Sequence, residues 1–168
     1  AEQQRAGGSG VYYHLSYWGR PHDYLWLSTM QLGLVWYEMS RAYQNGAQKI
    51  WIANVGDIKP AEYNMELFLD LAWDIEAVQE NSLETHLLNW CQREFGEEWA
   101  VEIAQIKTEY YRLAFLRKPE FMGWSQTEPI TPVGLSEFLP EHGLERRLAA
   151  YHKLYQQVDQ LAAKLPAE

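Results

Sequence analysis

The first part of the chain passes from an extended apolar run to a helical apolar pattern. Residues 11–17 are rich in Val and Tyr and are followed by a turn, which predicts a strand. Apolar residues between 32 and 43 then recur at helical spacing, so we expect a helix that starts near Ser28 or Thr29. Asn45-Gly46 supplies the left-handed residue that ends such a helix.

The same alternation repeats once more. Residues 49–54 (KIWIAN) form a short apolar run without alternation, which is typical of a parallel strand covered on both faces. Pro60 then precedes a second helical pattern that extends to Trp73. Two strands joined through a helix form a right-handed parallel pair, the unit of open α/β sheets and eight-stranded barrels. Two strands are too few for either, so other strands are expected elsewhere.

After residue 80 the pattern becomes entirely helical. Asn81 and Glu84 are three apart at a helix start, and an apolar stripe follows that ends at Gly96. A second stripe covers 99–117, and a third repeats at steps of four and three from 144 to 165, at Leu144, Leu148, Tyr151, Tyr155, Val158 and Leu165. These patterns predict an antiparallel helical bundle.

A long proline-bearing loop, 118–141, separates the last two helical patterns. Loops of this length are usually functional or mobile, and an ordered surface crossover pinned by its own aromatic side chains is an equal alternative. The fold class is therefore α/β and helix-rich: two βα units over 1–80, followed by a helical bundle over 81–168.

Composition and charge exclude several classes of partner. The net charge of -9 opposes phosphate backbones and anionic membranes, so we expect no nucleic acid and no membrane partner. Eight Trp and eleven Tyr exceed what a small core needs, and such residues are used at sugar-binding and protein-binding surfaces. Cys91 lies on an apolar helical pattern and is expected to pack as a small hydrophobic side chain. An export signal is absent from the first ten residues, although one could precede Ala1.

Candidate chemistry follows both predicted strands, because parallel sheets bind ligands at the carboxyl ends of their strands. The two stretches are HLSYWGRPHDY and NVGDIKPAEY. The pleat of the first strand places Tyr12, His14 and Ser16 on the side opposite Tyr13, where they form a polar set. Asn54 on the neighbouring strand is a possible partner. Tyr12 and His14 are either part of a ligand pocket or satisfied polar residues of the core.

Charged residues accompany both stretches. Arg20 and Lys59 offer donors for a carboxylate or an oxyanion, and Asp57 offers an acceptor for sugar hydroxyls or a proton-transfer group. Glu62 is better explained as a favourable acid in the first turn of a helix. The remaining His and Cys spacings do not match a zinc site, and the glycine pattern does not match a phosphate loop. We therefore expect no metal and no cofactor.

Three stretches resemble the α-glucuronidases of glycoside hydrolase family 115: GGSGVYYHLSYWGRP, YEMSRAYQNGAQKIWIANVGDIKPAEYNMELFLDLAWD and RKPEFMGWSQTEP. The resemblance extends from Gly7 to about Pro132, and the NVGDIKP turn is its most specific part. It implies a (β/α)8 barrel followed by a helical bundle, acting by inversion to remove 4-O-methyl-glucuronic acid from glucuronoxylan or aldouronic oligosaccharides. Residues 11–80 then resemble the last two βα units of the barrel, and a periplasmic or secreted location is implied.

The resemblance also implies roles for residues. Family members place a tyrosine and an asparagine of these two strands in the uronate pocket, which match Tyr12 and Asn54, with His14, Asp57 and Lys59 as neighbours. The general acid is expected on an earlier strand outside this chain, so the chain is expected to be a fragment that is inactive alone. Its partner is the rest of the barrel or a second copy. The alternative is a helix-rich interaction module with no catalytic role.

Overall fold

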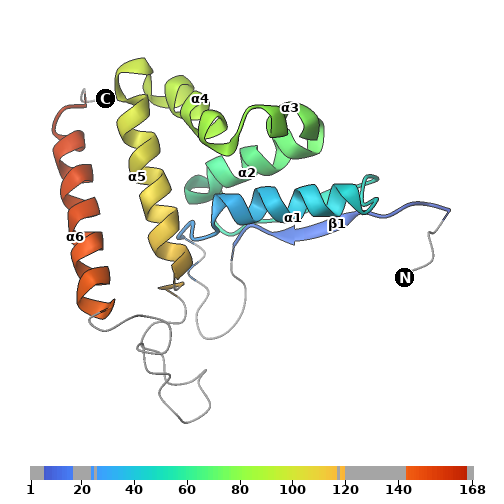
Figure 1. Ribbon diagram of the computed structural model, residues 1–168, viewed down its shortest axis with the longest axis horizontal. Coiled ribbons are helices and arrows are strands. Elements are labelled where there is room, and N and C mark those ends of the chain that lie inside the picture. Colours follow the sequence, from blue (N-terminus) through green and yellow to red (C-terminus); the bar gives the residue numbers. More distant parts are fainter. Residues whose placement is uncertain (1–5, 17–23, 25, 117, 120–142, 166–168) are drawn as a thin grey trace, which may run out of the picture.

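The computed structural model describes residues 6–16, 24, 26–116, 118–119 and 143–165. Within these ranges a small parallel sheet is accompanied by six helices (Figure 1). The predicted order of strand, helix, strand, helix is confirmed, and the described elements that follow are all helices, as expected. The elements are β1 (Val11–His14), α1 (Leu32–Gln44), β2 (Trp51–Asn54), α2 (Ile58–Trp73), α3 (Ile75–Glu80), α4 (Leu83–Phe95), α5 (Glu97–Leu116) and α6 (Gly143–Ala162).

The two strands pair in parallel, as predicted, and their register aligns Tyr12 with Ile52 and His14 with Asn54. Just before β1, Gly10 lets its backbone approach closely the backbone at Ile50, just before β2. A Cβ atom at Gly10 would lie 2.4 Å from the backbone oxygen of Ile50, inside van der Waals contact. The next residue donates its backbone N–H to that same oxygen at 2.9 Å, so the glycine fixes where the pairing begins.

The helices cover one face of this sheet. Tyr13 and Trp51 point to that face and contact Phe68 of α2, with ring centroids 6.3 Å and 5.6 Å from it. On the other face Tyr12 is 58% exposed and Ile52 is 46% exposed. The prediction that the second strand is covered on both faces therefore does not hold among the described residues. An apolar run of this kind with one open face indicates a surface made to be covered.

The core lies between the sheet and the helices and continues into α4 and α5. Its fully buried members include Val35 of α1, Leu67 and Phe68 of α2, and Cys91 of α4. Cys91 packs as a small hydrophobic side chain, as predicted, and burial raises the pKa of its thiol. One core cluster contains residues of α1 and α2 and also residues of α4 and α5. The packing of α4 and α5 therefore helps to hold α2 against the sheet.

Several helix boundaries differ from the predicted ones for local reasons. The first helix begins later than Ser28, because the Gln31 side chain accepts a hydrogen bond from a backbone N–H of the first turn. Pro60 lies inside the first turn of α2, where its missing N–H has no intrahelical acceptor to lose. At the start of α4 the cap is Ser82, whose hydroxyl accepts from the Thr85 N–H at 3.3 Å. The short helix α3 was not predicted.

The last two long helices, α5 and α6, run side by side in opposite directions (Figure 1). The predicted apolar stripe of α6 is not its contact face. The buried residues of α6 include Arg147, Leu154 and Leu161, whereas Leu148 is 59% and Tyr155 is 67% exposed. Two neighbouring faces of α6 are thus apolar, and α5 covers one of them.

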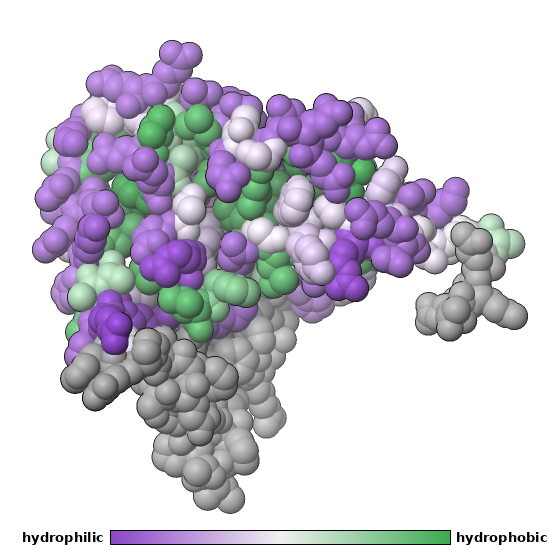
Figure 2. Space-filling view, viewed as in Figure 1, coloured by the Kyte–Doolittle hydropathy of each residue, from purple (hydrophilic) through white to green (hydrophobic). Residues whose placement is uncertain are grey.

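Apolar patches interrupt the otherwise hydrophilic surface over the helices (Figure 2). On α2 the outward side chains of Leu69 and Trp73 are 61% and 91% exposed. No described helix combines the length and apolar character needed to cross a lipid bilayer. Exposed apolar side chains such as Leu69 and Trp73 suit contacts with other protein surfaces.

Candidate functional site

The carboxyl ends of the two strands bring three of the predicted site residues together. Asn54 ends β2, and its side-chain amide donates a hydrogen bond to the hydroxyl of Tyr12 on β1 at 2.5 Å. The ring of His14 meets the ring of Tyr12 edge-on, with centroids 5.2 Å apart. All three residues point to the open face of the sheet, as the pleat and the register require.

Adjacent tyrosines on β1 lie in opposite environments. Tyr13 faces the helices, where burial, and secondarily the negative charge of Glu38, raises the pKa of its phenol to about 12. Tyr12 is on the solvent side, where its hydroxyl oxygen accepts from Asn54 and its O–H group can donate to a ligand. The pleat split that places Tyr12 and Tyr13 on opposite sides of β1 is thus confirmed, and the choice of Tyr12 for a ligand pocket stays a prediction. The hydroxyl of Tyr12 is therefore available to a ligand on that face.

The charged candidates sit in the turn after β2. Asp57 is the N-cap residue of α2, is exposed, and makes no side-chain capping hydrogen bond. Lys59 is also exposed, and its ammonium lies 3.7 Å from the Glu62 carboxylate. Such a surface pair contributes little free energy, so Lys59 remains able to turn toward another anion. The other predicted cation, Arg20, lies outside the described residues.

The polar set predicted on β1 is only partly exposed. The strand ends at His14, so the alternation stops there, and Leu15 and Ser16 are both buried. The Ser16 hydroxyl has no hydrogen-bond partner among the described residues. The two residues directly after β1 are therefore packed into the core.

The described residues contain no group of three or more His, Cys, Asp or Glu side chains placed to hold a metal ion. What Tyr12, His14 and Asn54 offer instead is hydrogen bonding: a phenol proton, an imidazole and a carboxamide at one edge of a sheet. Such an edge can orient hydroxyl groups, a carboxylate or a water molecule. None of these three side chains is a carboxyl group.

Comparison with known proteins gives this geometry a context. The family model of glycosyl hydrolase family 115 matches residues 1–121. The chain belongs to glycoside hydrolase family 115. A search of curated proteins returned no match. Among solved structures, a family 115 4-O-methyl-α-glucuronidase with specificity for decorated arabinogalactans is 47% identical, with a TM-score of 0.82. The alignment covers 97% of this chain and 22% of that one, so the chain spans about a fifth of the solved protein.

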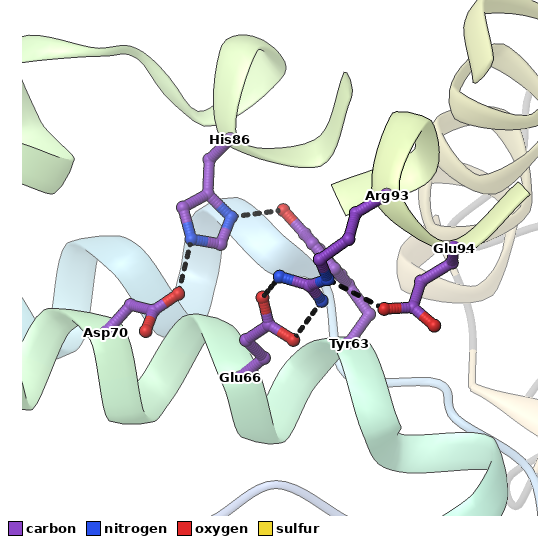
Figure 3. Close-up of polar contacts among 6 residues, drawn as sticks. All are labelled: Tyr63, Glu66, Asp70, His86, Arg93 and Glu94. Atoms are coloured by element: carbon purple, nitrogen blue, oxygen red, sulfur yellow. Dashed lines mark hydrogen bonds and ion pairs between the residues drawn. The ribbon is translucent and has the colours of Figure 1, made fainter. Parts of the chain in front are cut away.

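A second polar cluster in this family 115 chain was missed by the sequence analysis (Figure 3). His86 of α4 bridges two residues of α2: its Nδ1 lies 3.1 Å from the Tyr63 hydroxyl and its Nε2 lies 3.0 Å from the Asp70 carboxylate. Tyr63 is fully buried, and burial is the largest cause that raises the pKa of its phenol far above the ordinary value. An Asp–His–Tyr relay of this form resembles a catalytic arrangement, but its last hydroxyl is closed off from any substrate.

An ion-pair cluster extends the same contact between α2 and α4. Arg93 donates two hydrogen bonds to the Glu66 carboxylate, at 2.7 and 2.6 Å, and a third to Glu94 at 2.8 Å (Figure 3). These hydrogen bonds, first to Glu66 and then to Glu94, raise the pKa of Arg93. Together with His86, they lock α4 to α2 in one register. We assign this cluster a structural role. The helical spacing of Asp70 to Tyr63 was a signal in the sequence, but only the packing of α4 supplies the histidine.

Replacing His86 with leucine should destabilise the chain by about 1–3 kcal/mol, because the buried Tyr63 hydroxyl loses its partner. The measurement is urea unfolding followed by far-ultraviolet circular dichroism. The double variant His86→Leu with Tyr63→Phe no longer buries an unpaired hydroxyl, so its free energy of unfolding should be higher than that of His86→Leu alone. His152→Leu is the matched control, since His152 is exposed on α6. Equal costs for the single and the double variant would contradict the bridge.

Proposed function

We propose that this chain forms one wall of the active site of an α-glucuronidase that removes glucuronic acid or its 4-O-methyl form from a plant polysaccharide. The observation that carries the proposal is the hydrogen bond between Tyr12 and Asn54 at the carboxyl ends of two parallel strands. In barrels of βα units, catalytic residues come from this edge. Family membership supplies the chemistry, since the similar solved protein is a 4-O-methyl-α-glucuronidase.

In this proposal residues 1–80 are the last two βα units of a (β/α)8 barrel, and residues 81–168 are the helical bundle behind it. The open face of the sheet, with Tyr12 and Ile52, becomes the lumen side of the barrel. The exposed side chains of Leu69 and Trp73 on α2 become contacts with neighbouring barrel helices. Both unpaired strand edges are then covered by further strands, which removes the exposed edges that isolated pairs present.

Within the pocket, Tyr12 and Asn54 hydrogen-bond the uronate or position the attacking water, and His14 and Asp57 line the same edge. Lys59, or Arg20 from the loop after β1, balances the charge of the uronate carboxylate. The exposure of Lys59 and its weak pairing with Glu62 support this role, because little is lost when it turns to a substrate.

The proposal makes the chain inactive by itself. Inversion normally needs two carboxyl groups, roughly 6.5–9.5 Å apart, one as acid and one as base. The described strand ends contribute a phenol, an imidazole and a carboxamide. The general acid therefore comes from an earlier barrel strand.

The function is tested by incubating the full-length protein with glucuronoxylan and, in parallel, with a glucuronic acid-decorated arabinogalactan, and measuring released uronic acid. Release from glucuronoxylan with inverted anomeric configuration is the expected result. Release from arabinogalactan alone would correct the substrate, and no release from either would overturn the proposal.

A second candidate function, a non-catalytic interaction module, is favoured by the exposed apolar stripe of α6. The length of the native reading frame discriminates the two. Several hundred residues upstream with further βα units favour the enzyme, whereas a native start near Ala1 favours the module.

The chain alone is expected to self-associate at about micromolar concentration, because Ile52, Trp73 and Tyr155 leave apolar surface exposed on three separate elements. Sedimentation velocity over a range of concentrations measures this directly. Adding the missing part of the barrel should suppress it. A clean monomer at all concentrations would count against the need for a covering partner.

A further inference from the structure

A cleft of about 310 Å³ lies on the helical side of the molecule, where α5 and α6 meet the segment before α1. Trp26, which precedes α1, and Pro60, in the first turn of α2, also line it. Its other walls are apolar or aromatic, and the side chains that form them are Ile106, Tyr110, Leu154 and Val158. Neither family membership nor the pocket at Tyr12 assigns anything to this cleft.

Among the described residues that line the cleft, one is a cation. Lys107 of α5 is half-buried, with its ammonium 4.7 Å from the centre of the Trp90 ring. No hydrogen bond or ion pair joins it to any residue in the described part of the chain. The negative charge of Glu62 acts on Lys107 and raises its pKa, but the Glu62 carboxylate pairs with Lys59. Burial is the main cause that lowers the pKa of Lys107. Because Lys107 lines the cleft, an anion that enters can supply the oxygen acceptor that its ammonium lacks among the described residues.

The remaining polar groups make the cleft selective for one kind of anion. The hydroxyls of Ser28 and Tyr111 are 2.9 Å apart and satisfy each other. A sugar, with a hydroxyl on nearly every carbon, would find few partners among the other walls and would lose hydrogen bonds to water. A flat apolar body has no hydrogen bonds to water to lose, and it can lie against Trp26, which is 62% exposed.

We propose that this cleft binds a small monocarboxylate with a flat apolar body, its carboxylate on the Lys107 ammonium and its ring against Trp26. An aromatic carboxylate is the simplest member of this class. The site is separate from the edge at Tyr12 and Asn54, and its occupancy does not depend on the proposed function. It is therefore tested without measuring hydrolysis.

Benzoate is the probe, titrated into the chain by isothermal calorimetry. A ligand of this size is expected to bind with a dissociation constant on the order of 1 mM. Lys107→Met, which keeps an apolar stem, should weaken benzoate binding by at least about tenfold because the charge is lost. Trp26→Leu, at an exposed position, should weaken binding without affecting the fold. Lys164→Met is the matched control, since Lys164 pairs with Glu102 near the end of α6 and should leave affinity unchanged.

Two neutral or hydrophilic probes sharpen the test. Benzyl alcohol has the same ring without the charge and should bind about tenfold more weakly than benzoate. Glucuronate has the charge without the apolar body and should also bind more weakly. Melting curves check that each variant is folded. No benzoate binding up to about 20 mM, which is well above the expected constant, would overturn the proposal. So would unchanged affinity in folded Lys107→Met, or glucuronate binding as tightly as benzoate.

Discussion

Replacing Phe68 with alanine should destabilise the chain by about 3–5 kcal/mol, the largest stability effect we expect from one substitution. Phe68 is 1% exposed and lies where α2 meets the sheet. Its ring contacts Tyr13 of β1 in a stacked arrangement and Trp51 of β2 at a tilt of 52°. Removing the ring leaves a cavity that two rigid aromatic neighbours cannot fill without moving the strands.

Urea unfolding with far-ultraviolet detection measures this loss. The matched control is Leu69→Ala, the next residue on α2, which is 61% exposed and should cost about 0.5 kcal/mol or less. Because whole domains are stable by only about 5–15 kcal/mol, the Phe68 variant is expected to be partly unfolded at ambient temperature. A cost near that of the control would mean that the sheet does not depend on α2 for its position.

Replacing Asn54 with alanine in the full-length protein should lower turnover on aldouronic oligosaccharides by at least about tenfold. The amide of Asn54 holds the Tyr12 hydroxyl, so the substitution removes one polar group from the proposed pocket and frees another to rotate. Stability should change little, since Asn54 is half-buried at the end of β2 and the backbone hydrogen bond from Leu15 to its carbonyl remains.

Steady-state kinetics on purified variants separate this effect from a general loss of structure. Asn81→Ala is the matched control: Asn81 is exposed, and its side chain bonds only to the Ala77 carbonyl among the interactions described. Tyr12→Phe should show a defect similar to that of Asn54→Ala, because both remove the same hydrogen bond. If Asn54→Ala leaves the kinetics unchanged, Asn54 does not belong to the site.

Local patterns predicted most of the elements because their causes are local. Gly46, with φ of +88°, follows the end of α1, as the pair Asn45-Gly46 had indicated. Gly96, with φ of +84°, ends α4, where the predicted apolar stripe stops. Boundaries moved where a side chain outside the pattern was used as the cap, as at Gln31 and Ser82. The short helix α3, capped by Asp74, is too brief to produce a clear period.

In the candidate site, too, the local features could be predicted from the sequence, whereas the contact between strands could not. The period of two along β1 separates Tyr12 from Tyr13, and the parallel pairing follows from a helix between two strands. The hydrogen bond from Asn54 to Tyr12 depends on register, which the sequence left open and the close approach at Gly10 sets. Lys59 and Asp57 stay predictions as neighbours of the pocket; Asp57 is exposed as the N-cap of α2, and Lys59 is exposed in the first turn of that helix, paired to Glu62.

The amino-acid sequence by itself determined the family, the order of strand and helix, the parallel sense of the sheet and the side on which Tyr12 lies. The family follows from the resemblance of whole stretches of the sequence, and the other three follow from neighbouring residues or from short periods. The tertiary structure alone decided the bridge from His86 to Tyr63 and Asp70, the cleft around Lys107 and the face by which α6 packs on α5. These depend on the distance and rotation between helices far apart in the chain, which packing sets and no local pattern records.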